Sequence, residues 1–313
     1  MMTSPILIMG FNRPRKLSQC LSAVIRYGEG RKIYIAIDGA REGNTKDINK
    51  VRECIAVIDN HQTSRQGIIV RYSAVNRGCK YGPVEAIAWF LEHEQEGIIL
   101  EDDCIPSADF FPYCDDLLHR YRNDQQIWVI AGDNSANLKF SHEYSYTFAP
   151  EPLIWGWATW SDRWSRYDAD MKGWKEIRGT SLAEKVFRDR QQYETRSEVF
   201  NRVADGELST CWDYQLAATV RIDRGLCIIP RHNLVTNIGF GEDATHTTEE
   251  SNTRNTHPTN EIMPLYHPPC IFLDREVEQQ IIEQIQGVRY VSAWRKAARR
   301  ARNLLIKLLK NMR

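Results

Sequence analysis

Short apolar runs alternate with amphipathic helical patterns through the first 135 residues of the chain. The apolar runs predict strands at Ile6–Phe11, Ile33–Asp38, Ile68–Ala74, Ile98–Glu101 and Trp128–Ala131. The amphipathic segments between them predict helices at Pro14–Tyr27, Thr45–Ile58, Gly82–Glu94 and Asp109–Tyr121. Strand and helix repeated at this spacing predict an α/β fold, in which a parallel sheet carries helices on both faces.

Polar side chains follow the predicted strands at the points where they end. They are Asn12 and Arg13, then Asp38, then the segment Asn76 to Lys80, and finally the acidic run Glu101 to Asp103. Ligands of open α/β sheets bind beyond the carboxyl ends of the strands, so we expect these groups to converge on one crevice. Taken alone, Asp38-Gly39 is as readily a simple turn.

The second half of the chain is less regular. The segment PLIWGWATWSDRW, from Pro152 to Trp164, holds four tryptophans, which suit either a structural floor or a platform for sugar rings. The charged stretch Leu182–Val203 has the pattern of a solvated helical surface. A helix from about Asp213 leads to a strand at Gly225–Ile229 and a Gly-containing loop, and Ser251–Pro269 has the composition of a loop.

The charge of the chain is divided between an acidic body and a basic tail. Residues 289–313 contain nine Lys or Arg and no acid, which leaves 32 basic against 41 acidic residues elsewhere. One apolar stripe runs along this tail at helical spacing, through Val291, Trp294, Ala298, Ala301, Leu305, Leu308 and Met312. Such a helix is predicted to lie on an anionic membrane surface; a coiled-coil seam or docking on the body are the alternatives. The acidic body does not favour nucleic acid as a partner.

The eight cysteines are scattered without a C-x-x-C pair, which predicts reduced thiols and neither a zinc site nor a disulfide framework. The N-terminal apolar run is too short for a signal peptide, and no stretch approaches the roughly 20 residues of a membrane-spanning helix. We therefore expect a cytoplasmic protein, held peripherally on the inner face of the membrane by its tail.

The stretch GIILEDDCIPSADFF ends a buried strand with three adjacent acids, Glu101, Asp102 and Asp103. Adjacent carboxylates raise one another's pKa unless a cation neutralises them, and Mg²⁺ or Mn²⁺ does so while leaving positions open for phosphate oxygens. The alternative is that one Asp caps the following helix, where Ser107 and Asp109 also stand at cap positions. This explains a single acid and leaves two carboxylates over. The chain has no phosphate-binding G-x-x-x-x-G-K-[ST] loop and no G-x-G-x-x-G fingerprint. Hydrolysis of phosphate esters by two metals remains a competing use of such a cluster.

The order FNRP, AIDG, GIILEDDCIPSADFF, IAGDN, PLIWGWATW, CWDYQ, GLCIIP and GFGEDATH resembles the N-acetylglucosaminyltransferase I family and its bacterial relatives. It covers roughly residues 5–248. The resemblance implies the GT-A glycosyltransferase fold, a Rossmann-like mixed sheet with helices on both faces, over residues 1–270. Residues 1–135 would form the nucleotide-sugar-binding half and 136–270 the acceptor half. Residues 271–313 would form a C-terminal helical segment ending in the basic amphipathic tail.

The resemblance also implies roles for individual residues. Asp103 would bind Mn²⁺ or Mg²⁺ and Asp213, after Trp212, would be the catalytic base. The donor would be contacted by Arg13 and Asp38 at the nucleobase, by Glu101 and Asp102 at sugar and ribose, and by Lys80 and His246. Trp157 and Trp212 are the predicted acceptor surface. Asp213 is alternatively a helix cap.

These expectations describe a metal-dependent, inverting transferase that moves a sugar from a nucleotide diphosphate sugar to a glycan or lipid-linked glycan. A UDP-sugar, with N-acetylglucosamine as candidate sugar, follows from the resemblance. Two other functions stay open from the sequence. One is a metal-dependent phosphodiesterase acting on nucleotide sugars, and the other is a catalytically silent protein that binds nucleotide sugars or glycans.

Overall fold

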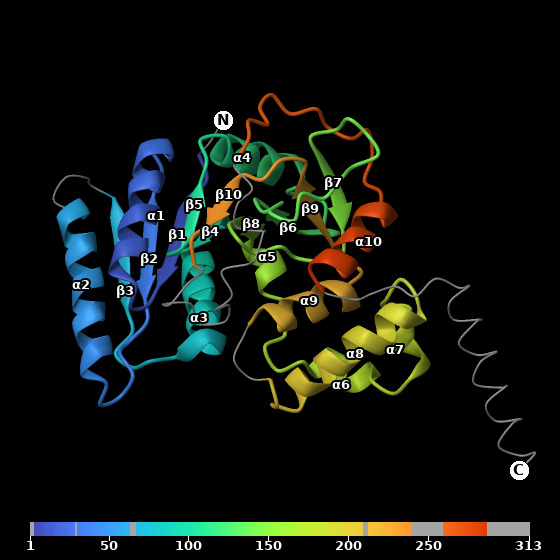
Figure 1. Cartoon of the computed structure of the whole chain (residues 1–313), viewed down its shortest axis with the longest axis horizontal. Coiled ribbons are helices and arrows are strands. Elements are labelled where there is room, and N and C mark those ends of the chain that lie inside the picture. The colour runs from blue at the N-terminus through green and yellow to red at the C-terminus, as the bar shows by residue number, and fades with distance from the viewer. Residues whose placement is uncertain (1–2, 29, 63–66, 209–211, 240–258, 287–313) are drawn as a thin grey trace, which may run out of the picture.

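The computed structural model describes residues 3–28, 30–62, 67–208, 212–239 and 259–286. A mixed sheet with the strand order β3-β2-β1-β4-β8-β6-β9-β7 runs through the described part of the chain (Figure 1). Its strands are β1 (Ile6–Gly10), β2 (Ile33–Ile37), β3 (Ile68–Tyr72), β4 (Glu96–Glu101), β6 (Ile127–Ala131), β7 (Tyr146–Ala149), β8 (Trp157–Trp160) and β9 (Leu226–Pro230). A separate two-stranded ribbon pairs β5 (Cys104–Pro106) with β10 (Val235–Asn237).

Strands β1 to β4 are parallel to one another, as the sequence pattern predicts. The sheet departs from an all-parallel arrangement at β8, which lies antiparallel between β4 and β6, and again at β7, which is antiparallel to β9. The tryptophan-rich segment that precedes and includes β8 therefore joins the two halves of the chain into one sheet. This bears out the mixed α/β fold class with helices on both faces.

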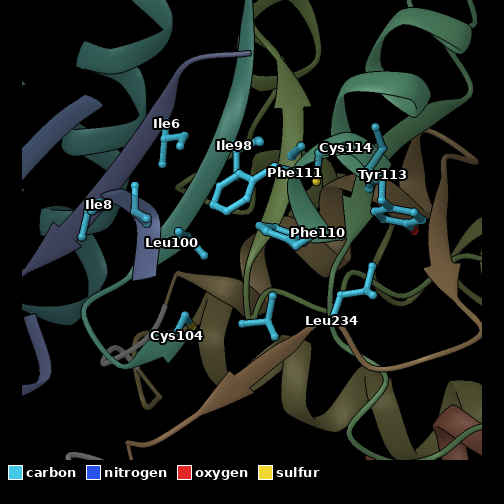
Figure 2. Packing of buried hydrophobic residues seen from close by; sticks show 14 of the residues in the cluster. Ile6, Ile8, Ile98, Leu100, Cys104, Phe110, Phe111, Tyr113, Cys114 and Leu234 are labelled. Carbon is cyan, nitrogen blue, oxygen red and sulfur yellow. The ribbon is translucent and has the colours of Figure 1, made fainter. Parts of the chain in front are cut away.

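Helices cover both faces of the sheet because alternate strand residues point to opposite sides. Ile6 and Ile8 pack with α1 (Pro14–Tyr27), α2 (Thr45–Gln62) and α4 (Phe110–Arg120). Figure 2 shows these isoleucines on the side of the sheet toward Phe110 and Phe111. Leu7 and Met9 pack on the other face with α3 (Gly78–His93), α5 (Ser161–Trp164), α9 (Asp213–Ile222) and α10 (Arg275–Gln284).

A third layer of helices covers α9 on the side away from the sheet (Figure 1). It consists of α6 (Lys172–Ile177), α7 (Ser181–Lys185) and α8 (Arg190–Ala204). The prediction that Leu182–Val203 is solvated surface is wrong for one side of this segment. Phe187, Phe200 and Val203 are buried against Trp174, because apolar residues spaced around a mostly charged sequence still form one covered face.

The helices of the first half lie where the sequence predicts them, with shifted ends. α1 has the predicted bounds, α2 runs past Ile58 to Gln62, and α3 starts at Gly78 instead of Gly82. Proline is common in a first helical turn, which made Pro83 a natural start signal. Gly78 adopts a φ of 71° and turns the chain into the helix one turn earlier.

A buried ion-pair network fastens α9 to its neighbours. Glu151 accepts hydrogen bonds of 3.0 Å from Arg196 of α8 and 3.0 Å from Arg221 of α9, and Arg221 also lies 3.8 Å from Glu278 of α10. The two arginines hold the pKa of Glu151 below its ordinary value against the opposing effect of burial. Moving α9 away would separate Arg221 from Glu151 and leave uncompensated buried charges, which is costly. The network therefore holds α9 in position.

The described cysteines are free thiols, in keeping with the prediction for them. Cys20, Cys54, Cys104, Cys114 and Cys227 are buried, and Cys79 and Cys270 are exposed. Among the described residues, no helix combines the length and apolarity that a membrane crossing requires. The predicted basic tail helix, residues 289–313, lies outside the described residues.

Candidate functional site

A pocket of about 470 Å³ lies at the carboxyl ends of β1 to β4. Phe11 to Arg13 follow β1, Asp38 follows β2, Ser73 and Asn76 follow β3, and Glu101 and Asp103 come from the end of β4. The predicted convergence of strand ends on one crevice is therefore confirmed. Its walls also include Arg41, Arg71 and Trp155.

Arg13 pairs with two of the three acids at the end of β4. Nε of Arg13 donates to Asp102 at 3.3 Å, Nη2 donates to the other oxygen of Asp102, and Nη1 donates to Asp103 at 2.6 Å. Asp102 is fully buried and does not line the pocket. Its predicted contact with ribose is therefore corrected to an internal ion pair. Arg13, expected beside the nucleobase, lines the pocket and also pairs with Asp102 and Asp103.

Burial and repulsion between neighbouring carboxylates raise the pKa values of Glu101 and Asp102. The pKa of Glu101 rises to about 8 through burial first and then through Asp103, with Asp102 and Asp213 adding to the effect and Arg13 opposing it. Burial likewise raises the pKa of Asp102 to about 6 against the opposing charge of Arg13. A further cation in the pocket would favour the charged form of Glu101.

The donor set suits a divalent cation only in part. No cluster of three metal-binding side chains exists among the described residues. Mg²⁺ is, however, usually held by one or two carboxylates together with substrate phosphates. Asp103 and Glu101 both line the pocket. Gly239 lies so close to the carboxylate of Asp103 that a side chain at position 239 would clash with it. The residues fit a cation site that phosphate oxygens complete.

Asp38 holds the loop between β3 and α3. Its carboxylate accepts hydrogen bonds from the backbone N–H of Arg77 at 2.8 Å, from that of Gly78 at 3.0 Å, and from Nδ2 of Asn76 at 3.0 Å. It also accepts from the N–H of Gly39 at 2.9 Å. With these bonds made, Asp38 shapes the pocket wall and has little capacity left for the predicted nucleobase contact.

Asp213 lies in the first turn of α9 and does not line the pocket, but its charge adds to the rise in the pKa of Glu101. The N-cap of α9 is Trp212, which makes no side-chain cap hydrogen bond, so the alternative of Asp213 as the cap residue is not what the structure shows. A carboxylate in the first helical turn is favoured by the helix dipole. The pKa of nearby Tyr167 is raised by burial first and by Asp213 next.

Aromatic rings fix the backbone that carries Asp213. The hydroxyl of Tyr167 donates to the carbonyl of Trp212 at 3.0 Å, and Trp164 stacks on Tyr167 with ring centroids 4.5 Å apart. The Trp212 ring in turn stacks on Trp157 at 5.8 Å. The cluster is thus a scaffold for the start of α9.

The predicted acceptor platform of Trp157 and Trp212 is corrected by this packing. Their exposed fractions are 1% and 3%, so neither offers an open ring face to a sugar. Clustered tryptophans at a strand are equally well satisfied by packing on one another, which a sequence does not reveal. The ring of this region that reaches the pocket is Trp155.

Two further predicted donor contacts are not found in the pocket. The ammonium of Lys80 lies over the ring of Tyr81 at 5.0 Å and is absent from the pocket lining. His246 lies outside the described residues. Sequence analysis missed Arg41 and Arg71, which line the pocket; the signal for Arg71 was a cation inside the apolar strand IIVRY.

Fold and site together define a mixed α/β protein with a pocket, lined by both acidic and basic side chains, at the carboxyl ends of its parallel strands. No protein-family model matches the chain, and no curated protein matches it. Among solved structures, the galactosyltransferase LgtC, crystallised with donor and acceptor sugar analogues, matches with a TM-score of 0.37 and 12% identity over 93% of this chain and 99% of that chain.

Two other solved structures also match. The glycosyltransferase GlyE of Streptococcus pneumoniae TIGR4 has a TM-score of 0.30 and 11% identity over 66% of this chain and 50% of that chain. A putative glucose-1-phosphate thymidylyltransferase from Bacillus anthracis has a TM-score of 0.31 and 12% identity over 56% of this chain and 84% of that chain. At these values the likenesses assign neither a family nor an activity to this chain.

Proposed function

We propose that this protein is a glycosyltransferase that moves a sugar from a nucleotide diphosphate sugar to a glycan or lipid-linked glycan acceptor. One observation carries the proposal. Glu101 and Asp103 enter the pocket at the end of β4, while Asp213 lies close enough to Glu101 to raise its pKa. A diphosphate site and a separate general base are the two parts that direct displacement at an anomeric carbon needs.

The pocket suits a donor of nucleotide-sugar type. Its volume of about 470 Å³ falls in the usual range for small-molecule sites, roughly 300–1,000 Å³. Phe11 offers an apolar ring, and Arg41 and Arg71 offer hydrogen-bond donors for anionic or carbonyl oxygens. The sequence resemblance favours UDP as the nucleotide and makes N-acetylglucosamine the candidate sugar.

Asp213 is the proposed base. It accepts the proton of the acceptor hydroxyl while that oxygen bonds to the anomeric carbon and the diphosphate leaves from the opposite side. Single displacement of this kind inverts the anomeric configuration. Tyr167 and the stacked tryptophans hold the start of α9, so the carboxylate is oriented before the acceptor arrives.

Mn²⁺ or Mg²⁺ is the proposed cofactor, held by Asp103 and Glu101 together with donor phosphate oxygens. Such an ion, when bound, stabilises the negative charge that develops on the departing diphosphate. Asp103 would hold such an ion while it also accepts a hydrogen bond from Arg13. Arg13 donates two further hydrogen bonds to Asp102.

Donor binding is tested by thermal shift with UDP-, GDP- and dTDP-sugars, each with and without Mn²⁺. A ligand that binds only the folded state stabilises it by mass action and so raises the melting temperature. At a ligand concentration of 100 times its Kd, the stabilisation is about 2.7 kcal/mol. We expect the wild type to show a metal-dependent shift with one nucleotide family, and Asp103→Asn to lose this shift. Asp59→Asn is the control and should keep the shift, because Asp59 is exposed and does not line the pocket. The absence of a shift with every donor would refute the proposal.

Catalysis is tested by product analysis. NMR of the product should show an inverted anomeric centre, and Asp213→Asn should lose turnover while keeping the donor-induced thermal shift. Retained configuration contradicts the role of Asp213 as base. Release of sugar phosphate and nucleoside monophosphate without any acceptor would instead identify a phosphodiesterase.

The proposal includes a peripheral location on the inner face of a membrane, supported by the basic stripe of residues 289–313. The full chain and a chain ending at residue 286 should be compared for sedimentation with anionic vesicles at physiological salt. Equal binding of the two chains would exclude the tail as the membrane anchor.

A further inference from the structure

A second, smaller pocket of about 380 Å³ lies on the other side of Arg13 from the donor pocket. Its lining includes the four cations Arg13, Arg15, Lys16 and Lys50, together with Gln19, and no carboxylate. The two pockets meet at the segment after β10, where Asn237 and Gly239 line the larger pocket and Ile238 lines the smaller one. Arg13 is the residue that both share.

Two of the cations in this pocket, Arg13 and Lys16, differ in whether the protein pairs them with an acid. Arg13 is paired with Asp102 and Asp103. Nζ of Lys16, by contrast, is buried and has no hydrogen-bond partner in the part of the chain that the structure describes. Burying an ammonium group is costly unless it is paired. An anion bound beside Lys16 would remove that cost.

The first turn of α1 likewise carries cations without a neighbouring acid. Its N-cap, Arg13, makes no side-chain cap hydrogen bond, and its first turn holds no acidic residue and carries Arg15 and Lys16 instead. The amino end of a helix favours negative charge, so two cations there are unfavourable in the free protein. Backbone N–H groups at a helix start, joined by cationic side chains, form a ready site for phosphate.

We propose that the pocket of Arg15, Lys16 and Lys50 at the start of α1 is a phosphate-binding site separate from the donor pocket. Its ligand is a phosphomonoester or diphosphate group, which matches several cations and helix N–H donors better than a carboxylate does. Two sources present this group, a soluble phosphorylated compound and the headgroup of an anionic lipid. The proposal does not rest on the glycosyltransferase function.

The probe is inorganic pyrophosphate, titrated by calorimetry in buffer with a chelator so that no divalent ion takes part. We expect Lys16→Met and Arg15→Gln each to weaken pyrophosphate binding at least tenfold relative to wild type. Neither residue lines the donor pocket, so the loss reports on this site alone. Lys46→Met is the matched control because Lys46 is an exposed cation on α2 one turn from Lys50 and does not line the pocket. Its affinity should stay within twofold of wild type.

Stability gives a second readout. Without pyrophosphate, Lys16→Met should melt at a higher temperature than wild type, because it removes a buried ammonium group that has no hydrogen-bond partner within the described residues. Pyrophosphate should raise the melting temperature of wild type and of Lys46→Met, but not that of Lys16→Met. If Lys16→Met proves unstable, the exposed Arg15→Gln decides the question. Wild-type protein that fails to bind pyrophosphate at millimolar concentration, or an Arg15→Gln variant that binds it like wild type, overturns the proposal.

Vesicles distinguish the two sources of phosphate. Vesicles of phosphatidic acid, which presents a phosphomonoester, and of phosphatidylcholine are compared with wild type and Lys16→Met, both as full chains. A weaker binding of Lys16→Met to phosphatidic acid identifies a lipid headgroup as the ligand. Equal vesicle binding together with lost pyrophosphate binding identifies a soluble phosphate compound. A failed donor thermal shift would leave these results unaffected.

Discussion

Nη1 of Arg13 lies 2.6 Å from Oδ2 of Asp103, inside an acidic cluster whose sequence alone suggested a metal. The same guanidinium holds Asp102, which is fully buried. The protein thus carries a permanent cation of its own at this strand end. A metal ion that bound with the proposed donor would share the neutralisation of the cluster with this side chain.

Arg13→Ala should destabilise the protein strongly, because it leaves the buried carboxylate of Asp102 without its partner. Removal of one member of a buried pair typically costs about 3–5 kcal/mol. The double variant Arg13→Met with Asp102→Asn removes both charges and should recover much of this loss. Urea denaturation of the variants measures both effects; a loss below about 1 kcal/mol in Arg13→Ala would show that Asp102 is not dependent on the pair.

Glu101→Gln should stabilise the free protein increasingly as pH rises. The pKa of Glu101 is about 8 in the folded protein against an ordinary value of 4.5, so between these values the folded state binds a proton that the unfolded state does not. The wild type therefore loses stability as pH rises through this window, by at most about 1.4 kcal/mol per pH unit for one group. The variant lacks this loss. Denaturation midpoints from pH 5 to 9 test it, and a difference that shrinks toward pH 8 would contradict it.

Tyr167→Phe should slow turnover while leaving donor affinity nearly unchanged. It removes the 3.0 Å hydrogen bond to the carbonyl of Trp212, just before Asp213. The stability cost should be about 1 kcal/mol, whereas even a small misplacement of a reacting group can lower kcat by roughly tenfold or more.

Tyr113→Phe is the matched control for Tyr167→Phe. Tyr113 is fully buried whereas Tyr167 is partly buried, and the hydroxyl of Tyr113 has no hydrogen-bond partner within the described residues. Both kcat and stability of this variant should equal or exceed those of wild type. Steady-state kinetics and thermal melts compare the two variants, and a Tyr167→Phe variant with unchanged kcat would remove the scaffold role.

Asp38→Asn should raise KM for the donor, by about tenfold or more, with a smaller effect on kcat. An amide group replaces one carboxylate oxygen, so the N–H groups of Arg77 and Gly78 lose an acceptor and the pocket wall loosens. Limited proteolysis should cut the loop between β3 and α3 faster in the variant. Glu42→Gln, an exposed change near the same end of the sheet, is the control. Raised KM without any change in proteolysis would point to direct donor contact by Asp38.

The sequence anticipated the elements of the first half because their patterns are local. Strand β1 and helix α1 follow from apolar periodicity and from Pro14 at a helix start, and polar residues after parallel strands must meet at one sheet edge. The convergence of Asp38, Glu101 and Asp103 on one pocket was therefore predictable. So was the helix that begins at Asp213.

Pairing between distant segments was decided only by the tertiary structure. The antiparallel insertion of β8 between β4 and β6 depends on which strands find one another, and not on the pattern within any of them. The same holds for the burial of Trp157 under Trp212. Aromatic residues at a strand satisfy a core and a sugar surface equally well until their neighbours are known.

The sequence by itself determined the α/β class, the strand ends that form the pocket, and the acids that enter it. Only the tertiary structure decided how those acids are divided: Asp102 to an internal pair with Arg13, and Glu101 and Asp103 to the pocket. The physical reason is that residue type fixes what a side chain can bond to, whereas burial and the nearest charge decide which bond it makes.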